Sequence, residues 1–215
     1  MAKDTPATRD IIVIGGSSGG FEPLLKLAHG LEADLPATVF VVVHVGSNSH
    51  LAQILNRSGP LPAAAAGSGE GVLRGKIYVA VPGCHLLLHD GHILLRRGPR
   101  ENLSRPAIDA LFRTAAATFG GRVIGVVLSA ALSDGTAGLR AIKRCGGLAV
   151  VQDPAEALVS SMPSSALRHV DVDHICRVKD MPGLLAKLVR QPAGPTPDIP
   201  LGIRIEAGIA AQELG

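Results

Sequence analysis

Residues 11–20 carry the sequence IIVIGGSSGG, an apolar run that ends in glycines and serines. The apolar residues are typical of a buried strand, and the glycines indicate a tight turn at its end. Residues 21–30 place apolar side chains on one helical face, and residues 38–44 form a second apolar run, TVFVVVH. A strand, a helix and a strand at this spacing predict a βαβ unit with parallel strands.

The remainder of the chain continues this alternation of apolar runs and helical patterns. Between residues 71 and 97, the turn dipeptides Pro82-Gly83 and Asp90-Gly91 separate three short β runs and predict an antiparallel insertion. We therefore expect an α/β fold with a doubly wound, mostly parallel sheet and an antiparallel hairpin insertion near its edge. The short β runs lie at 76–80, 85–88 and 92–95, further parallel strands at 123–128, 148–152 and 174–178, and helices at 51–56, 105–119 (with Pro106 in its first turn), 138–145, 164–170 and 181–190.

The length of 215 residues fits one large domain. Aromatic residues make up only 2% of the chain, so the core is expected to consist of Val, Ile, Leu and Ala. Four prolines lie between residues 191 and 200. We therefore expect one domain over residues 1–190 and a proline-rich, linker-like C-terminal tail over 191–215, with a docked segment from Leu201.

Composition argues against several classes of function. The net charge is only +3, and the densest basic stretch, from Arg96 to Arg105, contains no aromatic residue, so nucleic-acid binding is not expected. The three cysteines lie far apart without a CxxC pattern, which indicates neither a disulfide framework nor a zinc site. No apolar run reaches the roughly 18 residues of a membrane span, so we expect no membrane insertion and a cytoplasmic location.

The glycine-serine turn is the first candidate for chemistry. Gly15-x-Ser17-x-Gly19 fits a nucleophile elbow, in which a serine follows a strand and precedes a helix. Gly16-x-Ser18-x-Gly20 fits the same pattern, so spacing alone does not choose between the two serines. A glycine-rich turn of this kind also binds phosphate, which keeps a nucleotide- or phosphate-binding α/β domain as an alternative, although no P-loop Lys-Ser/Thr follows.

His44 and Asp134 follow two further predicted strands. The carboxyl ends of parallel strands meet at one edge of the sheet, where Ser17, His44 and Asp134 would form a catalytic triad. Each residue also has a structural interpretation: His44 as a hydrogen-bonded core residue, and Asp134 as the cap of the helix near Gly138. His50 is the nearest competitor for the base, and the hairpin histidines lack the pattern of a metal site.

Several motifs in one order resemble the catalytic domain of CheB-type chemotaxis-receptor protein-glutamate methylesterases. The resemblance runs from about Ile11 to Val189. The family often has Gly-Met-Gly where this chain has Ala130-Ala131-Leu132, and a histidine at the position of Ser104. The matching stretches are IGGSSGG at 14–20, VVH at 42–44, GKIYVAVPGCHL at 75–86, SRPAIDALF at 104–112, LSDGTAG at 132–138 and MP at 162–163.

The resemblance implies a serine hydrolase that removes methyl groups from glutamate methyl esters through an acyl-enzyme. It assigns Ser17, not Ser18, as nucleophile, His44 as general base and Asp134 as the residue that orients it. No metal or organic cofactor is involved, and some members also deamidate glutamine. Because the usual receiver domain is missing before Ile11, we expect a stand-alone catalytic domain; a catalytically inactive binding module of the same fold is an alternative.

The resemblance also suggests roles for residues around the triad. Ser18 and Ala131 belong to the turns that form the oxyanion hole. Arg105 and Met162 are candidates for substrate binding, and Arg105 with the neighbouring basic residues would attract an acidic helix. The expected partners are methylated chemotaxis receptor helices, with a separate response regulator or kinase as a candidate regulatory partner.

Overall fold

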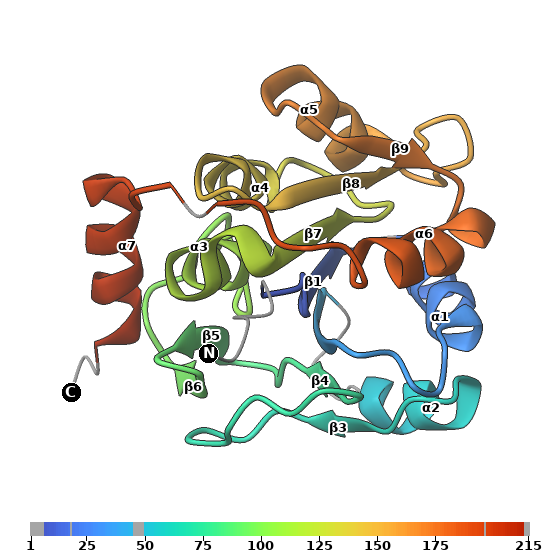
Figure 1. The fold of residues 1–215 in the computed structure, drawn as a ribbon, viewed down its shortest axis with the longest axis horizontal. Coiled ribbons are helices and arrows are strands. Elements are labelled where there is room, and N and C mark those ends of the chain that lie inside the picture. Colours follow the sequence, from blue (N-terminus) through green and yellow to red (C-terminus); the bar gives the residue numbers. More distant parts are fainter. Residues whose placement is uncertain (1–6, 18, 45–49, 196, 213–215) are drawn as a thin grey trace, which may run out of the picture.

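The computed structural model describes residues 7–17, 19–44, 50–195 and 197–212. Within these residues, seven strands form one parallel sheet, and two more strands form a separate antiparallel hairpin (Figure 1). The sheet order is β3 (Ala63–Ala65), β4 (Ile77–Val79), β2 (Thr38–Val43), β1 (Ile11–Gly16), β7 (Val123–Val127), β8 (Leu148–Gln152) and β9 (His174–Cys176), and the hairpin pairs β5 (His85–His89) with β6 (His92–Arg96). The predicted α/β class with its hairpin is confirmed.

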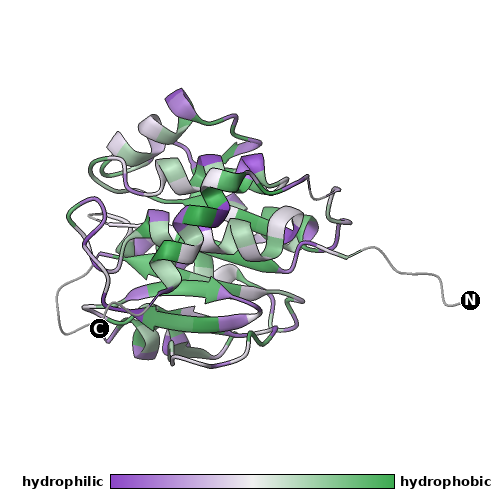
Figure 2. Cartoon of the chain, turned by 90° about the vertical axis from the view of Figure 1, so that its left-hand side faces the viewer, coloured by the Kyte–Doolittle hydropathy of each residue, from purple (hydrophilic) through white to green (hydrophobic). Residues whose placement is uncertain are grey.

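Helices cover both faces of the sheet because side chains alternate along each strand. Ile12 and Ile14 of β1 belong to one apolar layer, and Val13 belongs to the other. Figure 2 shows the strands hydrophobic along their length, whereas the helices around them are mixed. The first layer contains α1 (Phe21–Gly30), α2 (Leu51–Ser58) and α6 (Met181–Leu188), and the second contains α3 (Ile108–Phe119), α4 (Thr136–Arg144) and α5 (Ser161–His169). Two 3₁₀ turns, η1 (Gly120–Arg122) and η2 (Val178–Asp180), complete the domain.

The C-terminal segment contains a further helix, α7 (Leu201–Ala211), which packs on α3 and the hairpin (Figure 1). Ile203 is buried in the same apolar layer as α3, and the backbone carbonyl of Ala211 accepts a hydrogen bond from Arg96 at 2.9 Å. The segment after Leu201 is therefore a docked helix, as the sequence suggested. In the part of the chain that the structure describes, no helix is long and apolar enough to cross a membrane.

Several sequence-based boundaries were wrong. Residues 77–79 do not join the antiparallel insertion but form β4, a parallel strand between β2 and β3, because Ile77, Tyr78 and Val79 are buried on both faces of the sheet. Tyr78 stacks on Phe40 of β2 with ring centroids 5.4 Å apart. Two helix starts were also misplaced, because α3 begins three residues after its predicted start and α5 begins three residues before it.

The helix α3 starts at Ile108, so Pro106 precedes it and is joined to Arg105 by a cis peptide bond. A side chain at Gly15 of β1 would collide with Ile108. The absence of a Cβ there lets the first turn of α3 lie directly on the end of β1. This close approach brings the backbone N–H groups at the start of α3 to the carboxyl edge of the sheet.

The carboxyl edge contains the expected switch point of a doubly wound sheet. The strands β1 and β7 are neighbours, but α1 follows β1 on one face of the sheet and α4 follows β7 on the other. Their loops therefore separate at this edge and leave a crevice, which is the usual place of an active site in such folds. Ser17 follows β1, His44 follows β2, and Asp134 lies in the loop after β7.

Candidate active site

Ser17 is the first residue after β1, at the start of the glycine-serine turn. Its backbone N–H donates to the carbonyl of Ser129 at 3.3 Å, and its carbonyl accepts from the N–H of Gly20 at 2.8 Å. A Cβ on Gly20 would lie 2.6 Å from the Ser129 carbonyl oxygen, so the turn needs glycine at this position. Ser18, the competing serine, lies outside the described residues.

His44 lies beside this turn because of the strand register. Gly16 and Val43 are the last paired residues of β1 and β2, and the N–H of His44 donates to the Gly16 carbonyl at 3.1 Å. Ser17 and His44 therefore each come one residue after the same pair. Alternation along the two strands directs both side chains toward the layer that contains α3.

Asp134 binds the start of α3 with a buried carboxylate. Its two oxygens accept from the backbone N–H groups of Ile108 at 2.8 Å and Asp109 at 3.0 Å, the first two residues of α3. The side-chain amide of Asn102 donates to it at 2.8 Å. Asp134 therefore caps a helix distant in sequence, whereas the N-cap residue of α4 is Gly135, with φ of 95°.

The carboxylate of Asp134 also faces the imidazole of His44, with 3.2 Å between Oδ2 and Nε2. The ring N–H does not point along this line, so Nε2 makes no well-directed hydrogen bond here. Burial alone would raise the pKa of Asp134. The contact with His44 and the N–H donors of Ile108, Asp109 and Asn102 outweigh it and hold that pKa below its usual value. Asp134 is therefore ionised at neutral pH.

Ser17, the third member of the expected triad, is not bonded to His44. Among the described residues, no hydrogen bond joins the Ser17 hydroxyl to the His44 ring. Because Nε2 faces Asp134, Nδ1 is the ring nitrogen that remains for a proton from Ser17. Bonds between a nucleophile and its base commonly tighten only when substrate is bound.

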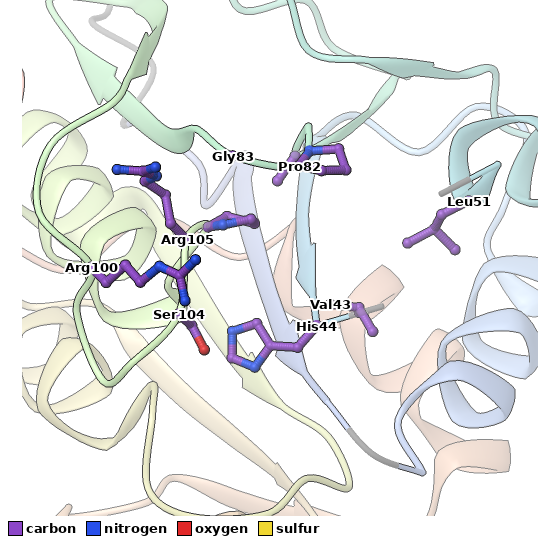
Figure 3. A pocket seen from close by; sticks show the side chains of 10 residues that line it. Val43, His44, Leu51, Pro82, Gly83, Arg100, Ser104 and Arg105 are labelled. Carbon is purple, nitrogen blue, oxygen red and sulfur yellow. The ribbon is translucent and has the colours of Figure 1, made fainter. Parts of the chain in front are cut away.

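A cavity of about 300 Å³ opens beside His44 (Figure 3). The side chain of Arg100 reaches toward Ser104 and the His44 ring. Arg105 turns away, and its Nη1 donates to the backbone carbonyls of Arg97 and Gly98 at 3.1 and 2.8 Å. The lining contains two arginines and no carboxylate, which suits a substrate with acidic surroundings. It consists of Val43, His44, Leu51, Ala80, Pro82, Gly83, Arg100, Ser104, Arg105 and Pro106.

The loop after β7 presents a backbone donor near the site. The N–H of Ala130 donates to Val159 at 3.1 Å, and its carbonyl accepts from Met162 at 3.0 Å, which fixes this part of the loop. The next N–H, that of Ala131, has no hydrogen-bond partner within the described ranges. The Met162 side chain is fully buried in the core, so the structure does not bring it to the cavity.

His50 and His85 have structural contacts. His50 is exposed, and its Nδ1 lies 2.8 Å from the side-chain oxygen of Gln53. Buried His85 uses both ring nitrogens, because Nδ1 accepts from the Ala107 N–H and Nε2 donates to the Pro99 carbonyl. No group of three or more His, Cys, Asp or Glu side chains among the described residues is arranged to hold a metal ion.

Sequence reasoning missed two polar residues behind Asp134. The amide of Asn102 donates to Asp109 Oδ2 as well as to Asp134 Oδ1, both at 2.8 Å. Asp109 is buried, and its other oxygen accepts from the backbone N–H of Gly138 at 2.6 Å. A carboxylate within the apolar pattern of α3 was the available signal for Asp109. No local pattern indicated Asn102.

Comparisons with known proteins give matches to one family. The family model described as CheB methylesterase matches residues 12–185. A Leptospira interrogans protein provisionally named protein-glutamate methylesterase/protein-glutamine glutaminase is 37% identical over 83% of this chain and 94% of its own length. An Anaeromyxobacter dehalogenans protein-glutamate methylesterase/protein-glutamine glutaminase is 35% identical over 84% of this chain, which spans 54% of it. The crystal structure of the Thermotoga maritima CheB methylesterase catalytic domain superposes with a TM-score of 0.80 at 29% identity, covering 86% of this chain and all of that one.

Proposed function

Because this chain belongs to the CheB methylesterase family, we propose that it is a serine hydrolase that demethylates glutamate methyl esters on chemotaxis receptors. In this proposal Ser17 is the nucleophile, His44 the general base and Asp134 the residue that orients His44. The observation that carries the proposal is the 3.2 Å contact between His44 and Asp134 beside the Ser17 turn. A phosphate-binding domain does not require this contact, and labelling of Ser17 separates the proposal from an inactive module of the same fold.

The reaction has two stages with the same base. In the first, His44 Nδ1 takes the Ser17 hydroxyl proton while Ser17 Oγ attacks the ester carbonyl. The bond from carbon to the methoxy oxygen then breaks, methanol leaves with the proton from His44, and an acyl-enzyme remains. In the second, His44 takes a proton from water, the resulting hydroxide attacks the acyl carbon, and Ser17 leaves with the proton from His44. Ionised Asp134 stabilises the imidazolium in both stages.

The negative oxygen of each tetrahedral intermediate needs backbone donors. The unbonded N–H of Ala131 supports its role as one donor. The second donor is the backbone N–H of Ser18, which stays a prediction from the sequence. Hydrolysis of glutamine side chains, which is part of the relatives' names, would follow the same steps with ammonia as the leaving group.

Three exposed leucines beside the site form a surface, called the rim, that has the character of a protein-binding surface. They are Leu103, Leu132 and Leu158, which are 84%, 68% and 82% exposed. Leu103 and Leu132 also have φ of 63° and 64°, a backbone region that is unfavourable for leucine. Leu158 lies against Gly19 of the serine turn. Exposed apolar side chains at strained positions beside a site support contact with a partner rather than a role in folding.

A partner with apolar and acidic side chains fits this rim and the unpaired arginine beside it. Among the described residues Arg100 makes no hydrogen bond or ion pair. An amphipathic receptor helix that carries acidic residues around the methyl ester would contact both features. The cytoplasmic location and the separate regulatory partner remain predictions that follow from this substrate.

Changes on the rim should weaken binding of a protein substrate without affecting the chemistry. We expect Leu132→Asn and Arg100→Gln each to raise KM for a methylated receptor fragment about 10-fold, near the loss of one good interface contact, with kcat little changed. Hydrolysis of a small methyl ester should be unaffected. The matched control is Leu73→Asn, since Leu73 is also exposed but lies at the opposite edge of the sheet. Equal losses on both substrates would contradict the rim's role.

The function is tested by methanol release from receptor fragments that carry glutamate methyl esters. We expect release with the wild-type chain, none from unmethylated fragments, and inhibition by a fluorophosphonate that labels Ser17. Absence of methanol release from several methylated receptors would reject the proposal. Nucleotide binding by calorimetry in the same protein would favour the phosphate-binding alternative, and failure to label Ser17 would favour the inactive module.

A further inference from the structure

The buried carboxylate of Asp109 and the amide of Asn102 contact Asp134 but take no part in the proposed reaction. Asp109 lies in the first turn of α3 and is 5% exposed. Its carboxylate does not contact the cavity, and Asp134 separates it from His44. A buried second carboxylate beside the first is unfavourable for folding, since the two charges repel each other. Its presence therefore needs a reason.

Asn102 connects the two carboxylates. One amide nitrogen donates to Asp109 Oδ2 and to Asp134 Oδ1, at 2.8 Å in both cases. The amide oxygen would be repelled by two carboxylates, so the nitrogen is the atom that fits this place. The residue is also suited to its backbone, because φ of 50° is a left-handed value that asparagine tolerates well.

The two carboxylates also cap the first turns of two neighbouring helices. Asp134, from the loop before α4, accepts from the first N–H groups of α3, and Asp109 of α3 accepts from the N–H of Gly138 in α4. Asp109 is therefore fixed through one oxygen by α4. Its other oxygen fixes Asn102, which in turn fixes the rotation of Asp134.

We propose that Asn102 and Asp109 are positioning residues that hold the Asp134 carboxylate toward His44. The inference rests on the proposed function and deepens it. Neither residue touches the substrate. Asp109 orients the amide, and the amide holds Asp134 Oδ1 so that Oδ2 faces His44 Nε2.

The charge state of Asp109 gives this arrangement a dependence on pH. Burial and then the charge of Asp134 raise the pKa of Asp109 to about 6, although the Gly138 N–H, Asn102 and Arg113 act in the opposite direction. Arg113 is itself paired with Glu101, and the titratable ring of His44 lies on the far side of Asp134. Above pH 6 the ionised carboxylate accepts from Asn102. Below it, the bound proton competes with the amide N–H, and the bridge weakens.

Two substitutions remove the bridge with little change to the backbone. Asn102→Gly deletes the amide and suits the left-handed φ. Asp109→Asn keeps an acceptor for the Gly138 N–H but turns an NH₂ group toward the NH₂ of Asn102. We expect each to lower kcat about 10-fold with KM within about two-fold, since a misplaced triad member affects the transition state. Because both act through one bridge, the double variant should lose no more than either single variant.

The matched control is Asp90→Gly, a polar residue with φ of 47° in the remote β5–β6 turn, which should leave kcat unchanged. The ratio of wild-type to Asp109→Asn kcat should fall from about 10 at pH 8 toward 1 below pH 6. Multiplicative losses in the double variant, a ratio that stays constant with pH, or a rise in KM alone would overturn the inference.

A readout without catalysis separates this inference from the proposed function. In carbon-13 NMR, the pKa of Asp134 should rise toward its usual value in Asn102→Gly, because one of its donors is lost. If the wild type hydrolyses no ester but this shift occurs, the proposed function fails and the positioning role stands. If the wild type is active and neither the shift nor the kcat loss occurs, the positioning role fails.

Discussion

Replacing Ser17 by alanine should lower kcat for methanol release by about 10⁴-fold or more, because the hydroxyl that forms the acyl-enzyme is absent. The turn itself should remain intact. Its hydrogen bonds from Ser17 use only backbone atoms, and alanine keeps both of them. We therefore expect an unchanged urea midpoint. The measurement is single-turnover methanol release from a methylated receptor fragment, followed in parallel with binding of the same fragment.

The control for this prediction is Ser18→Ala, since the sequence pattern fits both serines equally well. The register of β1 and β2 favours Ser17, which shares its position after the last strand pair with His44. Ser18→Ala should retain most of the activity and should still be labelled by a fluorophosphonate. If Ser18→Ala abolishes release and Ser17→Ala does not, the nucleophile is Ser18.

Replacing Asp134 by asparagine should have the second largest effect, a loss of about 10⁴-fold in kcat. Asparagine has one acceptor oxygen, whereas the carboxylate accepts hydrogen bonds with two. Its neutral amide also does not stabilise the imidazolium of His44. The same change should destabilise the fold by about 1–2 kcal/mol, because one N–H group at the start of α3 loses its cap. The two effects are measured separately by steady-state kinetics and by urea unfolding at pH 7.

The pH dependence of stability provides an independent check on Asp134. Its pKa in the folded chain is lower than its ordinary value of 3.8, so its contribution to stability is present above that pH and disappears as the pH falls through the lower folded value. The difference in stability between wild type and Asp134→Asn should therefore shrink as the pH falls below about 4. A difference that stays constant down to pH 2 would show that the carboxylate is not specially stabilised.

Most of the fold could be predicted because its elements have strong local signals. The apolar runs at β1, β2, β7 and β8 are long, and the Asp90-Gly91 turn identifies the hairpin. The short strand β4 was misassigned because its three residues look alike in a parallel or an antiparallel context. Only the pairing with β2 decides between them, and pairing is a property of the folded chain.

The candidate site could be predicted in part. Ser17, His44 and Asp134 each follow a predicted strand, and the topology of the sheet brings such positions together. The capping of α3 by Asp134 could not be predicted, since local sequence suggested a cap for the following helix. Asn102 gave no signal because its amide acts on two side chains that are 7 and 32 residues away along the chain. The assignments to Ser18, Ala131 and Arg105 stay predictions.

The crossed caps of α3 and α4 have a consequence for how the protein folds. Neither helix satisfies all the backbone donors of its first turn with its own residues, because Ile108 and Asp109 of α3 donate to Asp134 and Gly138 of α4 donates to Asp109. The two helix starts must therefore become ordered in one cooperative step, which also sets Asp134 opposite His44. A partly folded chain with one complete helix start and the other unformed is therefore disfavoured, and the proposed triad would be assembled together with the native state rather than after it.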